Sequence, residues 1–166
     1  MTKYIMLLTP LFLLLACGGD DGNDPVDDNA QSDADTTPVW VTYAGIEWSP
    51  LRTRRVTWES AKNYCGAMGA RLPTINELRK IIINCPQTEY GGVCKASDPD
   101  CLRWDCWSEG CDCDGSADSY SALGDIHRLW SSSSRVEIYA AWFVDFSDGK
   151  VSYYNKSGEQ NTRCVR

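Results

Sequence analysis

Nine cysteines occur in a chain of 166 residues, and this density constrains the possible folds more than any other feature. Chains so rich in cysteine are typical of oxidising compartments, where disulfides staple the fold. Cys17 lies apart near the N-terminus, and the remaining eight are an even number that suits four bridges. These eight are Cys65, Cys85, Cys94, Cys101, Cys106, Cys111, Cys113 and Cys164. The six from Cys85 to Cys113 fall within 29 residues, and the sequence does not choose among their possible pairings. Zinc is the alternative, but there is no C-x-x-C pair and only one histidine, His127.

The charges divide the chain into an acidic segment and a nearly neutral one. Residues 18–38 hold seven Asp and no basic residue, whereas residues 39–166 hold sixteen acids and fifteen bases. The formal net charge of −7 therefore belongs mostly to the first segment, and the basic footprint of a nucleic-acid partner is missing. Because its one large apolar residue is Val26, we predict that residues 18–38 form a disordered, self-repelling tether. Calcium or partner binding by the Asp run is the alternative.

Residues 1–16 have the pattern of an export signal. Lys3 supplies a positive charge, and the apolar stretch from Ile5 to Leu15 suits a signal peptide but is too short to span a membrane. The stretch ends in Leu14-Leu15-Ala16-Cys17, which resembles a bacterial lipobox. The resemblance implies cleavage before Cys17, diacylglycerol on its sulfur and an acyl chain such as palmitate on its new amino group. Gly18, where inner-membrane lipoproteins have Asp, implies the outer membrane. An ordinary secreted signal is the alternative.

Two helices are predicted in the domain of residues 39–166. Thr57 is placed to cap the first, Gly69 to end it, and its buried face is expected to carry Trp58, Ala61 and Cys65. The second begins with the capping box Thr74-Ile75-Asn76-Glu77. Its inward face is expected to hold Ile75, Leu78 and Ile82, with Ile81 beside them.

Strand-like segments precede and follow the helices, which predicts an α+β fold. Val39 to Trp48 reads as two short strands broken at Gly45, and Leu129 to Ser133 as another. Ala141–Phe146 and Val151–Tyr154 flank Asp148-Gly149, which favours a type I′ hairpin turn with Phe146 facing Val151 and Val144 facing Tyr153. Arg163 to Arg166 is expected to be a closing strand.

Several short motifs together resemble the Lcl C-terminal domain family. They are Gly45–Trp48, Thr57–Ala61 with Tyr64-Cys65, Arg71–Leu78, Leu129–Ser132, Ala141–Phe146 and Arg163–Arg166. The likeness covers residues 45–166 apart from an insertion before Leu129, and Ala70 stands where the family usually has Trp. It implies a C-type lectin-like fold, a distant relation to formylglycine-generating enzymes, and a bridge from the first helix to the last strand, Cys65 to Cys164.

Residues for catalysis are scarce. His127 stands beside Arg128 with no nucleophile elbow in the chain, a setting more typical of a surface or packing residue. The formylglycine-generating relatives need reactive, unbridged cysteines, whereas pairing is expected here. We therefore predict that the protein is not an enzyme.

An acidic, cysteine-rich insertion spans residues 86–128. Within it, Asp112, Asp114 and Asp118 form a D-x-D-G-x-x-D pattern, and closely spaced carboxylates around a glycine turn are how calcium loops gather oxygens. The pattern resembles part of a thrombospondin type 3 repeat more than an EF-hand. The pattern thus makes calcium the candidate cofactor, and a solvated loop pinned by disulfides is the alternative. The calcium-binding signatures of true C-type lectins are missing.

The insertion is also the candidate ligand surface, because long connections on rigid scaffolds often carry binding residues. Its candidate contacts are Trp104, Trp107 and Tyr120. The two tryptophan rings either pack in the core or stay exposed to stack on sugars or protein side chains, and a loop so polar and rich in cysteine favours partial exposure. The sequence therefore predicts a lipid-anchored adhesion-type module that recognises an extracellular polysaccharide or protein without catalysis. The alternatives are a purely structural envelope lipoprotein and a degenerate relative of the formylglycine-generating enzymes.

Overall fold

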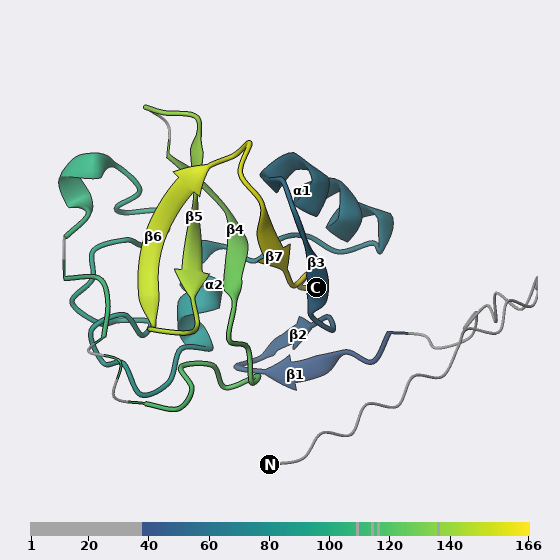
Figure 1. Cartoon of the computed structure of the whole chain (residues 1–166), viewed down its shortest axis with the longest axis horizontal. Coiled ribbons are helices and arrows are strands. Elements are labelled where there is room, and N and C mark those ends of the chain that lie inside the picture. The colour runs from purple at the N-terminus through teal and green to yellow at the C-terminus, as the bar shows by residue number, and fades with distance from the viewer. Residues whose placement is uncertain (1–37, 109, 114, 116, 136) are drawn as a thin grey trace, which may run out of the picture. The chain divides into compact units, whose positions relative to one another are not determined.

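The computed structural model describes residues 38–108, 110–113, 115, 117–135 and 137–166. The predicted signal peptide, Cys17 and nearly all of the predicted tether lie outside these residues. Within them the chain is α+β, as predicted from the sequence, and its form is consistent with a disulfide-stapled C-type lectin-like fold (Figure 1). The elements are β1 (Val41–Tyr43), β2 (Ile46–Trp48), β3 (Arg52–Val56), α1 (Trp58–Ala67), α2 (Ile75–Lys80), a 3-10 turn η1 (Trp104–Cys106), β4 (Arg128–Arg135), β5 (Ala140–Asp145), β6 (Lys150–Asn155) and β7 (Gln160–Thr162).

Two sheets form in the described part of the chain. β1 and β2 make a small hairpin, and the larger sheet has the strand order β3-β7-β4-β5-β6. Its pairs are antiparallel except for β4 and β7, which run parallel. Because side chains alternate along a strand, β5 contributes to two cores. Trp142 and Val144 pack in the cluster that contains α2 and the insertion, and Ala141 and Phe143 pack in the cluster that contains α1.

Both predicted helix starts are confirmed. The Thr57 hydroxyl accepts a hydrogen bond from the Ser60 amide, and Trp58, Ala61 and Cys65 are the buried residues of α1. In α2 both halves of the predicted capping box are made by Thr74 and Glu77. The helix ends earlier than its apolar pattern suggested. Ile81 and Ile82 are buried but follow α2, and Arg79 is the third buried residue within it.

The capping box makes stability depend on pH. Glu77 also holds Arg71 through two bonds of 2.6 and 2.7 Å. Burial alone raises the pKa of Glu77, but hydrogen bonds from Arg71 and Thr74 outweigh it and keep that pKa below its ordinary value. We expect Glu77→Gln to lower the free energy of unfolding by about 1 kcal/mol at neutral pH. Because the native carboxyl has the lower pKa, this difference is fully present above the pKa of the unfolded chain, about 4.3. It is lost as the pH falls through the native pKa, which urea titrations of both proteins at several pH values would check.

The predicted hairpin register is wrong by two residues. Val144 pairs with Val151 and Trp142 with Tyr153, so four residues, Phe146 to Gly149, form the loop. Side chains make this longer loop stable, because Asp145 accepts hydrogen bonds from the Ser147 amide and hydroxyl, and Asp148 accepts one from the Lys150 amide. Phe146 is fully buried although it lies in this loop. The predicted two-residue turn would instead have placed Phe146 in a strand, paired with Val151.

Two other strand predictions need correction. The closing strand is β7, Gln160–Thr162, and not Arg163–Arg166, where Val165 instead makes isolated bridges to Trp48 and Arg71. β3 was not predicted, because its sequence Arg-Thr-Arg-Arg-Val lacks apolar alternation. It forms as an edge strand through its pairing with β7. No helix among the described residues is long and apolar enough to cross a membrane.

Candidate functional site: the disulfide-stapled insertion

Four disulfides join the eight cysteines from Cys65 to Cys164. The bridge between Cys65 and Cys164 confirms the pairing that the family resemblance implied. The other three lie one inside another along the chain: Cys85–Cys113 encloses Cys94–Cys111, which encloses Cys101–Cys106. The insertion is therefore a set of nested loops whose smallest ring holds Trp104.

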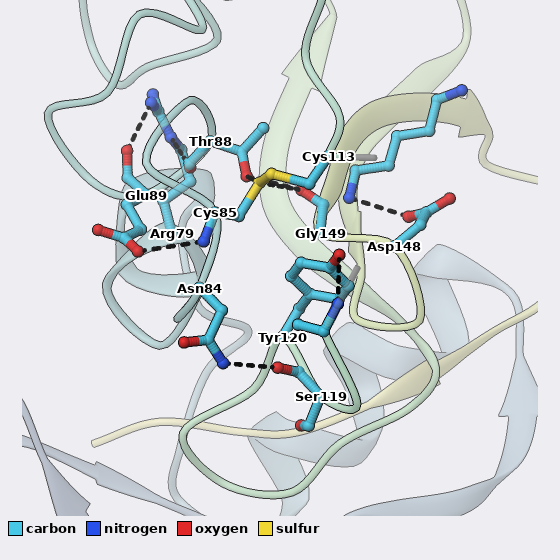
Figure 2. Close-up of a disulfide and its surroundings, with 12 residues drawn as sticks. Arg79, Asn84, Cys85, Thr88, Glu89, Cys113, Ser119, Tyr120, Asp148 and Gly149 are labelled. Carbon is cyan, nitrogen blue, oxygen red and sulfur yellow. Dashed lines mark hydrogen bonds between the residues drawn. A yellow bond between two sulfur atoms is a disulfide. The ribbon is translucent and has the colours of Figure 1, made fainter. Parts of the chain in front are cut away.

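The outermost of these bridges fixes the base of the insertion to the sheet. Figure 2 shows the Cys85–Cys113 disulfide with Thr88, Tyr120 and Gly149 around it. The Thr88 hydroxyl donates to the Gly149 carbonyl over 2.7 Å. Gly149 has a φ of +68°, and a Cβ there would lie 3.0 Å from the Cys85 sulfur. This position therefore requires glycine, both for its backbone conformation and for the close approach of the disulfide.

Backbone hydrogen bonds extend this attachment along the edge of β6. The Val151 amide donates to the Cys111 carbonyl, and the Cys113 amide donates to the Asp148 carbonyl. The insertion thus covers the first part of an edge strand, which would otherwise present unpaired backbone groups.

A buried arginine organises the first part of the insertion. Arg79 is only 2% exposed, and burial lowers the pKa of its guanidinium from the ordinary value. Its nitrogens donate to the carbonyls of Thr88, Glu89 and Ala96 over 2.6 to 2.8 Å. The signal for this role was present in the sequence, since Arg79 follows Ile75 by four residues and falls on the apolar face of α2.

Two acids of the insertion are structural. Asp98 Oδ2 accepts hydrogen bonds from the Ile75 amide and the Ser133 hydroxyl, which ties the insertion to α2 and β4. Asp125 is 1% exposed and is paired with Arg163. The sequence alone assigned no role to either acid, because their partners lie far away along the chain.

The structure separates the two tryptophans of the insertion. Trp104 is 65% exposed and begins η1 inside the Cys101–Cys106 ring. Trp107 is half-buried and packs edge-on against Tyr153, with ring centroids 6.1 Å apart. Trp107 thus holds the ring of residues 101–106 against β6, while Trp104 faces solvent.

Tyr120 does not fit its predicted role. Its side chain is fully buried in the core, and its hydroxyl accepts a hydrogen bond from the Ala117 amide. The ring packs below the β5–β6 loop, where a Cβ at Gly149 would lie 3.1 Å from it. The prediction of Tyr120 as a ligand contact is corrected, because a ring with no accessible surface has none to offer a ligand.

The predicted calcium residues are only partly described. Asp112 is half-buried and Asp118 is exposed, whereas Asp114 lies outside the described residues. Among the residues that are described, no group of three His, Cys, Asp or Glu side chains is placed to hold a metal ion. Calcium binding therefore stays a prediction.

An ion pair joins the ring of residues 101–106 to the β4–β5 loop. Arg103 Nε lies 3.3 Å from Glu137 Oε1, and Ile138 and Tyr139, which follow Glu137, are 47% and 65% exposed. We call Arg103, Trp104, Glu137, Ile138 and Tyr139 the tip surface. The tip surface thus combines two exposed aromatic rings and an exposed isoleucine with an ion pair that joins the two loops.

The geometry defines a small α+β domain of C-type lectin-like form with a stapled, aromatic-tipped insertion. The family model of the Lcl C-terminal domain matches residues 29–166, and the chain belongs to the Lcl C-terminal domain family. This confirms the family that the motifs resembled. No curated protein and no solved structure matches the chain.

Proposed function

We propose that this protein is a lipid-anchored module of the bacterial outer membrane that binds an extracellular glycan or protein without catalysis. The exposure of Trp104 carries this proposal. The Trp104 indole is 65% exposed within the short loop closed by Cys101 and Cys106, so most of its surface is accessible to a ligand.

Rigidity supports a binding role for this surface. The ring of residues 101–106 is closed by a disulfide, held to β6 by Trp107 and joined to the β4–β5 loop by Arg103. A loop that is already ordered loses little conformational entropy when it binds a ligand. Exposed indole rings stack on sugars and act as anchors in protein interfaces. The eight bridged cysteines also argue against chemistry that needs a free thiol.

The binding test is Trp104→Ala. Arrays of extracellular polysaccharides and matrix proteins serve as probes, and we expect the wild type to bind at least one of them. Loss of the Trp104 indole should weaken that binding about thirtyfold, as for an interface hot spot. The melting temperature should stay within about one degree, because an exposed ring contributes little to stability.

Tyr90→Ala is the matched control, since Tyr90 is an aromatic residue of the insertion that is 57% exposed and lies outside the small ring. Its binding should equal that of the wild type. Equal losses in both variants would contradict a site at the tip surface. A wild type that binds no probe would favour the structural lipoprotein instead.

Anchoring is tested by Cys17→Ser. If Cys17 is acylated, this variant should move from the membrane to the soluble fraction, because it lacks the acyl chains that stable attachment needs. Fractionation after a high-salt wash would measure this. A variant that remains in the membrane pellet would exclude Cys17 as the anchor.

A further inference from the structure

A cleft of about 250 Å³ lies on the larger sheet, away from the tip surface. Its walls come from four strands or their ends: Arg55 of β3, Gln160 of β7, Arg128 of β4 and Asp145 of β5, with His127 and Ser147 beside them. Arg128 begins β4, whereas the tip surface follows the end of β4 at Arg135. The cleft and the tip surface are therefore at opposite ends of the β4–β5 hairpin.

The carboxylate of the cleft is already satisfied. Asp145 Oδ2 accepts from Arg128 Nε over 2.7 Å, and Asp145 Oδ1 accepts from the amide and hydroxyl of Ser147. Burial raises the pKa of Asp145, but the hydrogen bonds from Ser147 and Arg128 outweigh it, so the net shift is downward. Asp145 thus remains an anion that orients Arg128 and leaves both terminal nitrogens of that guanidinium for another acceptor.

Two further residues of the cleft, Arg55 and Gln160, have hydrogen-bond donors that are not used within the described residues. Arg55 donates from Nε and Nη2 to the Glu159 carbonyl, and its Nη1 is left to donate to a ligand. Gln160 is 1% exposed, and its Nε2 finds no acceptor among the described residues. A buried donor without an acceptor is unfavourable, so an acceptor that binds in the cleft would satisfy it.

The arrangement favours binding over hydrolysis. Ser147, His127 and Asp145 are the residue types of a catalytic triad, but the Ser147 hydroxyl donates directly to Asp145. No hydrogen bond joins the His127 side chain to either of them in the described structure. The serine is therefore held as a donor to a carboxylate and is not activated by a base.

We infer that this cleft binds an oxyanion, namely a phosphate or a similar acidic group, free or at the end of a ligand. Two arginines against one paired carboxylate give the cleft a net positive charge in a chain whose formal charge is −7. Charge-assisted bonds from guanidinium groups to an oxyanion are among the strongest hydrogen bonds in proteins. This site is independent of the tip surface, so it stands or fails separately from the proposed function.

The test is titration of the full-length chain in detergent with inorganic phosphate. Calorimetry and the melting temperature measure binding, and sodium chloride of equal ionic strength is the reference. We expect Arg55→Gln to weaken phosphate binding about tenfold, the effect of losing one charge-assisted bond. Arg54→Gln is the matched control, because Arg54 is the neighbouring exposed arginine of β3 and does not line this cleft. It should bind phosphate as the wild type does.

Gln160→Leu provides a second arm, since it removes the unpartnered donor and leaves both arginines in place. It should weaken phosphate binding as Arg55→Gln does, and either variant that folds is sufficient for the test. Glucose 1-phosphate is then compared with inorganic phosphate. If the sugar phosphate binds more tightly, the site takes the end group of a larger ligand; if it binds more weakly, the site takes the free anion. Equal effects of Arg54→Gln and Arg55→Gln, or no response to phosphate beyond that to chloride, would overturn the inference.

Discussion

Replacing Cys65 and Cys164 together by alanine is expected to lower the free energy of unfolding by about 4 kcal/mol. The bridge joins α1 to the segment after β7 across a sequence separation of 99 residues, and both cysteines are fully buried. In the chain-entropy model, the loss of so long a cross-link greatly enlarges the unfolded ensemble. Urea unfolding of the wild type and the double variant, followed by tryptophan fluorescence, would measure the difference.

The matched control is the double variant of Cys101 and Cys106, which are separated by five residues. The same model gives about 2 kcal/mol for so short a loop. Under the proposed function, this control should also lose ligand binding, because it releases the ring that holds Trp104. If opening the short ring costs as much stability as opening the long one, loop entropy does not explain the role of the Cys65–Cys164 bridge.

Asp125→Ala should cost about 3–4 kcal/mol of stability, because it leaves a buried guanidinium without its partner. Arg163 donates to both oxygens of Asp125 over 2.9 to 3.0 Å. The side chain of Asp125 is only 1% exposed and that of Arg163 is 11% exposed. The pair joins the end of the insertion to the C-terminal segment, so its loss should loosen both. Denaturant unfolding would measure the change in stability.

The Glu47–Arg166 pair offers a control of the same chemistry, and its arginine follows Arg163 by three residues. Its N–O distance is 3.0 Å, but both side chains are 47% exposed. Glu47→Ala should therefore change stability by less than about 1 kcal/mol. Similar costs for Asp125→Ala and Glu47→Ala would show that burial does not set the strength of the Asp125–Arg163 pair.

The sequence identified the residues of the candidate site whose role depends on nearby residues, and it missed those whose partners lie far along the chain. The exposed Trp104 and the disulfide framework belonged to the predicted insertion. Arg79, Asp98 and Asp125 were not identified, although they hold the insertion in place. Their partners are carbonyls, hydroxyls and a guanidinium brought close by folding, and Arg163 is 38 residues from Asp125. Composition alone assigns such residues to solvent.

The sequence by itself determined the features whose interactions span a few residues. The caps at Thr57 and Thr74 involve residues three positions away, and the buried face of α1 follows from helical spacing. The family likewise follows from short motifs in a fixed order.

Only the tertiary structure decided the features that depend on distant partners. It chose the nested pairing of the six central cysteines, the four-residue loop between β5 and β6, and the burial of Tyr120 beneath Gly149. It also made a strand of β3, which pairs with residues more than a hundred positions away. Local chemistry permits several outcomes at each of these places, and the contacts that select one of them exist only once the two cores have packed on the sheet.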